Sequence, residues 1–356
     1  MTKPKTKMTD VCFSGDLFVG QRVGGATRYY SELLSLLPNL GTTTTTDLRV
    51  HISQYLSHTP TNGRFINLPT WRGSEYAFSK TVGRLRTHEP ERAKIFHPTY
   101  YTSEPKRGKI NVVTVLDMIH ELFPSIYGPE NATTKRKRLW VNCADIVIAI
   151  SESTAADLKR IPGFSPNSVQ VVPLGVDDRF LERPIEQTLR DQNLVLYVGG
   201  RGGYKNWEAA AIAMSDPRHS EKHLLNIGGG PATKEEVSKI ARLGLQGRVT
   251  FRSASDQMIV DSLRRAAVLL YPSLYEGFGL PLIEARATGC PVIATRGSSV
   301  TEVAGPNSIL TDGSPEALAE ALTKIPSTQT AGEQGLRKWI DCAVDHHNIY
   351  QRLLLS

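Results

Sequence analysis

The chain has 356 residues, 42 of them Lys or Arg and 35 Asp or Glu, which gives a formal net charge of +7. This length exceeds the size at which one hydrophobic core keeps growing, so we expect two domains. No apolar run reaches the roughly 18 residues that a membrane-spanning helix needs, and residues 1–8 lack the apolar stretch of a secretory signal, so we expect a cytoplasmic protein. The four cysteines lack Cys-x-x-Cys spacing, which disfavours a metal knuckle and a disulfide framework.

Short apolar runs recur along the chain, and each is followed by a segment with helical periodicity. This alternation is typical of a parallel sheet with crossover helices. In the first half the predicted strands are residues 11–13, 48–52, 95–96, 112–116, 146–150 and 169–172, while residues 42–46 are predicted to form a loop. In the second half they are residues 194–198, 224–227, 248–251, 268–271, 291–294 and 308–310. Each half therefore has enough strands for its own doubly wound α/β sheet.

The charged stretch 177–192, which contains Pro184, interrupts this alternation and is the best linker candidate. We therefore expect one Rossmann-like domain over residues 1–176 and a second over residues 177–334. Residues 335–356 follow a stretch rich in helix breakers, 326–332, and are predicted to form a terminal helix. Its apolar face would comprise Leu336, Trp339, Ile340, Ala343, Ile349 and Leu353.

Three segments of the first half carry candidate site residues. Gly24 and Gly25 precede a helix and permit close approach of the backbone to a ligand, although they could also be an ordinary helix start. His97 and Tyr100 follow the strand 95–96, where they could stack on a sugar or form an ordinary buried turn. Asp117 follows the strand 112–116, where its side chain should project from the end of the sheet.

His120 lies three residues after Asp117 and could position a hydroxyl, or could be structural. The densest basic run, residues 135–138, would be either a solvated helix face or a surface for anionic lipid.

In the second half, a Gly-rich loop follows the strand that ends at residue 198. Open α/β sheets present backbone N–H groups and cations to phosphate at this position. Lys205 and Arg201 could neutralise a departing diphosphate there, while Arg201 could instead face solvent. Gly199 opens this loop, and Gly229 lies in a second Gly-rich junction, 227–231, which alone is weak evidence because any tight turn can use glycine.

Residues 276–284, with the sequence Glu-Gly-Phe-Gly-Leu-Pro-Leu-Ile-Glu, are the most informative stretch. Pro281 is typical of the first position of a helix, which would place Glu284 in the opening helical turn and Glu276 in the turn before it. A helix N-terminus favours a bound diphosphate, and the two carboxylates could hydrogen-bond hydroxyls on its two sides. A nucleotide-sugar has this shape, whereas the alternative is two solvated charges beside a helix cap.

Residues 271–294 resemble the Glu-x7-Glu signature of retaining glycosyltransferases of family four. Their GT-B fold has two Rossmann-like domains facing across a cleft, with a C-terminal helix that crosses back to the first domain. By this resemblance Glu276 contacts the donor hexose and Glu284 the ribose, and Lys205 matches the family's Lys. Gly200 takes the usual Arg place, with Arg201 one residue later. Leu116 replaces the His of the family's His-Asp pair, and Asp117 is the catalytic candidate that the resemblance implies. The donor-binding residues would also include Gly277, Phe278, Gly279, Leu280, Gly24, Gly25, Gly199 and Gly229.

The resemblance implies metal-independent, cofactor-free, retaining transfer of a hexose from a UDP- or GDP-sugar to a glycan or lipid-linked glycan in surface polysaccharide or lipopolysaccharide synthesis. The chain contains no Asp-x-Asp metal motif. The alternatives are a nucleotide-sugar epimerase or hydrolase of the same fold and a non-catalytic protein that binds nucleotide-sugars or nucleic acid. The basic residues are dispersed without interleaved aromatics, which argues against nucleic acid. The charge would still permit peripheral association with a membrane.

Overall fold

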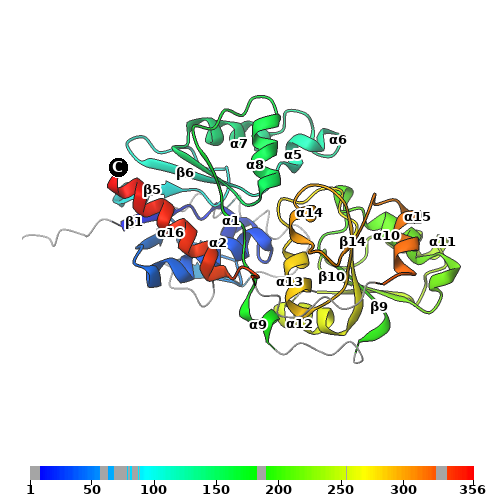
Figure 1. Ribbon diagram of the computed structural model, residues 1–356. Helices are drawn as coiled ribbons and strands as arrows, with labels where there is room; N and C mark the ends of the chain where they lie inside the picture. Colours follow the sequence, from blue (N-terminus) through cyan, green and yellow to red (C-terminus); the bar gives the residue numbers. More distant parts are fainter. Residues whose placement is uncertain are drawn as a thin grey trace, which may run out of the picture. The chain divides into compact units, whose positions relative to one another are not determined.

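The structure, a computed structural model, describes residues 9–56, 63–67, 78, 81, 87, 89–182, 190–253, 255–325 and 335–356 (Figure 1). By its internal contacts the chain divides into two compact units, which are each described by themselves. Unit 1 comprises Met1–Leu174 with Trp339–Ser356, and unit 2 comprises Gly175–Lys338. Among the described helices, none combines the length and the apolar character needed to span a membrane.

Unit 1 is built on a parallel six-stranded sheet in the order β2-β1-β5-β6-β7-β8. Its strands are β1 (Thr9–Phe13), β2 (Thr44–Thr46), β5 (Ala93–His97), β6 (Ile110–Val115), β7 (Ile146–Ala149) and β8 (Val169–Val171). Its helices are α1 (Asp16–Gly20), α2 (Gly25–Leu36), η1 (Leu37–Leu40), α4 (Glu89–Arg92), α5 (Ile119–Leu122), α6 (Pro124–Tyr127), α7 (Ala132–Cys143), α8 (Glu152–Arg160) and α16 (Trp339–Leu355).

The prediction from the sequence was wrong at one edge of this sheet. The edge strand is β2, within the predicted loop 42–46, and it pairs in parallel with β1. Its threonines are β-branched, which suits a strand, and Thr46 is buried. The predicted strand 48–52 shrinks to β3 (Val50–His51), which pairs only with β4 (Arg64–Phe65) in a separate two-stranded sheet.

The C-terminal helix α16 packs on α2, η1 and β1 of unit 1, which confirms the predicted return of the chain to its first domain (Figure 1). It begins at Trp339 rather than at residue 335, and Ile340, expected on the packed face, is 38% exposed. Buried His346 and Tyr350 complete that face instead. Burial of their polar atoms is tolerated because each residue has a hydrogen-bond partner in unit 1. Hydrophobic periodicity in the sequence cannot reveal such partners.

The tautomer of His346 follows from its partners. His346 Nδ1 lies 2.8 Å from the Cys342 carbonyl oxygen, which can only accept, so Nδ1 carries the proton. In a neutral His346 ring, Nε2 then accepts from the Tyr29 hydroxyl at 2.6 Å. Since the single Tyr29 proton is used in this bond, the Tyr29 oxygen accepts from the Thr114 hydroxyl at 3.0 Å. Each donor in this series has one defined acceptor.

His97 continues the same series towards α16. Thr114 Oγ1, having donated its proton, accepts from His97 Nε2 at 3.0 Å. Burial holds the pKa of His97 well below its ordinary value, so the ring is neutral and its unprotonated Nδ1 accepts from the Tyr350 hydroxyl at 2.7 Å. The five bonds form one continuous chain, from Tyr350 to the Cys342 carbonyl, in which both histidines are neutral. We call it the neutral chain.

Unit 2 carries a second parallel six-stranded sheet, in the order β11-β10-β9-β12-β13-β14. Its strands are β9 (Asp191–Val198), β10 (His223–Ile227), β11 (Val249–Arg252), β12 (Ala266–Tyr271), β13 (Val292–Thr295) and β14 (Ile309–Thr311). Its helices are α9 (Asp178–Leu181), η3 (Gly203–Lys205), α10 (Trp207–Met214), η4 (Pro217–His219), α11 (Lys234–Arg242), α12 (Asp256–Arg265), α13 (Leu280–Thr288), α14 (Val300–Val303) and α15 (Pro315–Leu322).

All six strands predicted for the second half are present in this sheet. Helices α12 and α13 lie on one face and α10 and α15 on the other (Figure 1). The predicted linker 177–192 is structured at both ends, by α9 and by the start of β9, while Pro184 and the breaker stretch 326–332 lie outside the described residues. The strand order reverses between β9 and β12, and open α/β sheets bind ligands at such a switch point.

Candidate active site in the second unit

An ion pair lies at the switch point of unit 2. Lys205 ends η3, which follows β9, and Glu276 lies in the turn after β12. Lys205 Nζ is 2.7 and 2.9 Å from the two carboxylate oxygens of Glu276, although the residues are 71 positions apart. The Lys205 side chain is 21% and the Glu276 side chain 9% exposed, so both charges retain some access to solvent. The structure thus brings together two residues that the sequence singled out separately.

The backbone around Lys205 is held by neighbouring segments. The Tyr197 hydroxyl lies 2.6 Å from the Gly200 carbonyl oxygen and 3.3 Å from that of Lys205. Leu274 N donates to the Tyr204 carbonyl at 2.8 Å, which ties the loop after β9 to the turn after β12. Burial raises the pKa of Tyr197, and the nearby Glu276 carboxylate raises it further. Tyr197 therefore stays protonated and can donate to this loop.

Two serines that the sequence left without a role hold the Glu276 turn. Glu276 N donates to Ser298 Oγ at 3.0 Å. The Ser299 hydroxyl lies 2.8 Å from the Glu276 carbonyl oxygen and 3.0 Å from that of Phe278. Ser298 adopts φ 43°, an uncommon conformation for a residue with a side chain. Their position directly after β13, the strand next to β12, was the only signal in the sequence.

The helix after this turn, α13, starts one residue earlier than predicted. Its N-cap is Gly279, with φ 93°, where an added Cβ would lie 2.9 Å from Leu282 Cδ1. A glycine has no side chain to cap the first N–H groups, which suits an anion at this end. Pro281 is the second helical residue, so Glu284 is the fifth and lies beyond the opening turn where it was predicted. Glu284 is 5% exposed.

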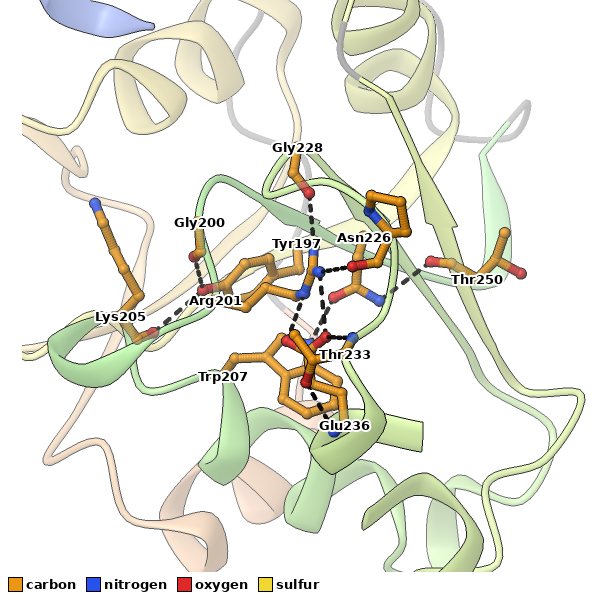
Figure 2. A network of polar contacts seen from close by, with 11 residues as sticks. Tyr197, Gly200, Arg201, Lys205, Trp207, Asn226, Gly228, Thr233, Glu236 and Thr250 are labelled. Carbon is orange, nitrogen blue, oxygen red and sulfur yellow. Dashed lines mark hydrogen bonds and ion pairs between the residues drawn. The ribbon is translucent and has the colours of Figure 1, made fainter. Parts of the chain in front are cut away.

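Arg201 differs from both expectations for it. Its side chain is 3% exposed, so the solvent-facing alternative is wrong. Arg201 Nε and Nη2 donate to the two Glu236 carboxylate oxygens at 2.8 and 3.2 Å, and Nη1 and Nη2 donate to the carbonyl oxygens of Gly228 and Pro231 at 2.7 and 2.9 Å (Figure 2). The guanidinium also lies 4.7 Å from the centre of the Phe251 ring. Its donors are directed at protein oxygens rather than left for a phosphate.

In unit 1, a buried lysine organises the end of β6. Lys137 Nζ is 2.8 Å from Glu121 Oε2, 2.9 Å from the Asp117 carbonyl oxygen and 3.9 Å from Asp117 Oδ1. Lys137 is 1% exposed, so the basic run 135–138 is not the single solvated face that one alternative assumed. The Asp117 carboxylate remains 33% exposed. His120 lies beside it against the Tyr127 ring, and burial together with Lys137 lowers the pKa of His120.

The other candidates of unit 1 have different surroundings. His97 is 0% exposed and belongs to the neutral chain, so the expectation that its ring meets an acceptor is corrected. Tyr100 is partly buried, and burial raises its pKa. Gly24 is the N-cap of α2, and Gly25 is the first residue of that helix. In the part of the chain that the structure describes, no three His, Cys, Asp or Glu side chains gather as metal ligands.

The family model of glycosyl transferases group 1 matches residues 178–338, which is nearly the whole of unit 2. D-inositol 3-phosphate glycosyltransferase 2 of Catenulispora acidiphila is 34% identical over 258 residues, which cover 63% of this chain and 60% of the relative. MMP alpha-(1->4)-mannosyltransferase of Mycolicibacterium hassiacum is 32% identical over 166 residues, which cover 45% of this chain and 39% of the relative. The chain thus spans about 39 to 60% of the length of these curated relatives.

Solved structures with the same fold cover the whole chain. Sucrose-phosphate synthase from Thermosynechococcus elongatus has a TM-score of 0.73 at 20% identity and covers 98% of this chain and 99% of its own. Anabaena HepE, solved in complex with UDP and glucose, has a TM-score of 0.65 at 17% identity and covers 97% and 95%. The family match covers residues 178–338, and the likeness to these solved structures shows that the chain has the fold of the GT-B glycosyltransferases.

Proposed function

We propose that this protein is a retaining, metal-independent hexosyltransferase that uses a UDP- or GDP-sugar and a glycan or lipid-linked glycan acceptor in surface polysaccharide synthesis. The observation that carries the proposal is the Lys205–Glu276 ion pair at the switch point of unit 2, next to the N-terminus of α13. An ammonium, a carboxylate and a helix N-terminus together match a diphosphate joined to a sugar. HepE, solved with UDP and glucose, supports this class of donor.

In the proposed reaction the bound diphosphate displaces Glu276 from Lys205. Lys205 and the first N–H groups of α13 then stabilise the negative charge of the leaving nucleoside diphosphate. The freed Glu276 carboxylate accepts hydrogen bonds from hexose hydroxyls, and Glu284 would bind the ribose. The bond from the anomeric carbon to the diphosphate breaks, the acceptor oxygen attacks from the same face, and its proton passes to a phosphate oxygen. Positioning and electrostatics supply the rate.

Binding of the donor can be tested without an acceptor. The purified protein is heated with UDP-, GDP- and ADP-sugars in turn, because a ligand that binds only the folded state raises the melting temperature. We expect a UDP- or GDP-sugar to do so, and Lys205→Met to abolish the shift. A panel without any shift would contradict the proposal. A free or epimerised sugar released from the donor without acceptor would instead favour the epimerase or hydrolase alternative.

A peripheral association with an anionic membrane would bring the enzyme to a lipid-linked acceptor on the cytoplasmic side. Helix α7 exposes Lys135 and Arg136 together with Leu139, which is 40% exposed, and this combination of cations and apolar surface suits a lipid headgroup region. Sedimentation with anionic and neutral vesicles tests this part separately. We expect binding to anionic vesicles that weakens with salt, and equal recovery with both vesicle types would refute it.

A further inference from the structure

The Arg201 guanidinium connects three segments of unit 2 that are distant in sequence. Arg201 lies in the loop after β9, its acceptors Gly228 and Pro231 belong to the loop after β10, and Glu236 is on α11 (Figure 2). Because β9 and β10 are neighbouring parallel strands, these two loops leave the sheet at the same edge. Arg201 therefore joins the loop that leads to Lys205, in the proposed donor site, to the loop after β10 and to α11.

The loop after β10 depends on this contact for its shape. Gly228, Gly229 and Gly230 have φ values of 95°, 70° and 77°, so three successive residues are in the left-handed region. Glycines lose much conformational freedom when they are ordered, and such a run needs support from outside. Arg201 supplies it by binding the carbonyl oxygen at each end of the run, on Gly228 and on Pro231.

The two loops also meet through their backbones. A Cβ on Gly229 would lie 3.2 Å from the Gly199 carbonyl oxygen and 2.7 Å from Arg201 Nη1. A Cβ on Gly228 would lie 3.4 Å from the same oxygen. The glycines thus leave room for the Arg201 side chain and for the Gly199 backbone at once. A change in the loop after β10 would therefore be transmitted to the loop that carries Lys205.

Glu236 completes the contact and neutralises it. Its Oε2 accepts from Thr233 N at 2.7 Å in the capping box of α11, and its two oxygens accept from Arg201. Burial raises the pKa of Glu236, but the hydrogen bonds from Arg201 and Thr233 outweigh it, so the net pKa lies below the ordinary value. The carboxylate is therefore ionised, and the close pair presents little net charge to a ligand.

We propose that Arg201 is a positioning residue, which with Glu236 fixes the two Gly-rich loops, and that Lys205 is the side-chain cation of unit 2 that contacts the donor diphosphate. This inference rests on the proposed function. It differs from a role as a phosphate ligand in one measurable respect. A ligand cation attracts the diphosphate through its charge, whereas a positioning residue acts through the geometry of Lys205.

Glu236→Gln separates these roles because it leaves Arg201 in place. If Arg201 were a phosphate ligand, release from Glu236 would leave diphosphate binding unchanged or tighter. For a positioning residue, we expect binding of UDP or GDP, whichever the wild type binds, to weaken about tenfold or more, since small misplacements of a binding group are costly. Glu320→Gln, which removes one of the two carboxylate partners of the exposed Arg218 in the same unit, is the matched control and should bind as the wild type does.

The salt dependence of diphosphate binding gives a readout that general destabilisation would not move. Salt screens a charge that contacts the ligand, so Lys205→Met should flatten the decrease of affinity with salt. Arg201→Gln and Glu236→Gln should weaken binding while keeping the wild-type slope. Arg201→Lys, which keeps the charge but not the forked geometry, should not restore affinity. A flattened slope in Arg201→Gln, or full affinity in Arg201→Lys, would overturn the inference.

Amide hydrogen exchange in the ligand-free protein tests the contact independently of any donor. We expect faster exchange at residues 199–203 and 228–230 in Glu236→Gln and Arg201→Gln than in the wild type, and no change in Glu320→Gln. Unchanged exchange in both site variants would refute the positioning role even if a nucleotide-sugar binds. Conversely, faster exchange in a protein that binds no nucleotide-sugar would refute the proposed function and, with it, the assignment of Lys205.

Discussion

The two sheets of this protein reverse their strand order in a similar way, but different side chains lie at the two reversal points. In unit 1 the point lies between β1 and β5, where Thr99 N donates to Ser14 Oγ at 3.0 Å and Thr99 Oγ1 donates to the Ser14 carbonyl at 2.8 Å. Ser14 is 0% and Thr99 1% exposed. In unit 2 the point lies between β9 and β12, where the partly exposed Lys205 forms an ion pair with the buried Glu276.

This difference separates topology from binding capacity. At the reversal point of unit 1, Ser14 and Thr99 bind each other inside the protein. The Asp16 and Asp47 carboxylates lie beside them and accept from Ser14 Oγ and Gly15 N. A ligand would therefore have to break buried hydrogen bonds. In unit 2 the Lys205 side chain is 21% exposed, so an anionic ligand can reach its ammonium and replace Glu276 as its partner. The topology of a doubly wound sheet thus sets where a ligand could bind, and the side chains at that point determine whether it binds.

The largest effect is expected when the Lys205–Glu276 ion pair of unit 2 is removed. Glu276→Gln and Lys205→Met should each lower kcat/KM for transfer by about 10²- to 10³-fold, since a preorganised group at developing charge contributes this much. Initial rates with a donor that binds, beside circular dichroism spectra, measure this. Lys324→Met disrupts the exposed Lys324–Glu320 pair of the same unit and should keep the wild-type rate. Near wild-type turnover in either site variant would remove that residue from the proposed mechanism.

Much of the fold could be predicted from the sequence, because apolar runs and their periodicity are local. The runs that became β5, β6, β9 and β12 are continuous and buried, and each was found. The threonine strand β2 was read as a loop because its residues are polar and its pairing with β1 is a tertiary property. For the same reason the terminal helix was found but its packed face was misread, since His346 and Tyr350 become compatible with burial only through the neutral chain.

The site was predictable in its residues but not in its contacts. Lys205 and Glu276 stood out because each follows a strand in a Gly-rich segment, whereas their pairing depends on β9 and β12 being neighbours. The partner of Arg201 could not be foreseen, since Glu236 looks like an ordinary helix-capping residue in the sequence. His97 followed a strand as Lys205 does, yet it is covered by α16, which comes from the far end of the chain.

A second prediction concerns unit 1 and interrupts its neutral chain. Thr114→Val removes the donor to Tyr29 and the acceptor for His97 Nε2 while keeping the shape of the side chain. We expect the free energy of unfolding of unit 1 to fall by about 1–3 kcal/mol, because buried polar groups lose their partners. Urea unfolding measures this. Nucleotide binding by unit 2 should not change, and a loss of nucleotide affinity with unaltered stability would contradict the separation of roles.

Thr323→Val is the matched control for this substitution. The Thr323 hydroxyl donates to the Glu320 carbonyl oxygen, but Thr323 is exposed, so solvent can replace the bond. Its effect on the free energy of unfolding should stay within about 0.5 kcal/mol. Equal losses in both variants would mean that burial of the neutral chain adds nothing to its stability.

A third prediction uses the pH dependence of stability to test whether His97 is neutral in the folded protein. Burial, with His346 as a second cause, holds the pKa of His97 well below its ordinary 6.5. Below about pH 6.5 the unfolded chain therefore binds a proton that the folded chain does not, so stability falls as the pH falls. The slope is about 1.4 kcal/mol per pH unit for one such group. Burial also lowers the pKa of His51 and His120, and these groups act in the same direction.

The contribution of His97 is isolated by comparing slopes. His97→Gln keeps a polar side chain that can accept from Tyr350 but does not titrate, so its unfolding free energy should depend less steeply on pH between about pH 7 and pH 5. Urea unfolding at several pH values provides both slopes. Identical slopes for the variant and the wild type would mean that His97 is not held neutral in the folded protein.

The smallest expected effect concerns the support of the charged pair. Ser299→Ala removes the hydroxyl that lies near the Glu276 and Phe278 carbonyl oxygens, but it leaves the bond from Glu276 N to Ser298 Oγ in place. One hydrogen bond contributes about 0.5–1.5 kcal/mol, so transfer should fall only several-fold. Because the turn aims Glu276 at the sugar rather than at the diphosphate, we expect a lower kcat with nearly unchanged affinity for the free nucleotide. A selective loss of nucleotide affinity would instead show that this turn forms part of the diphosphate site.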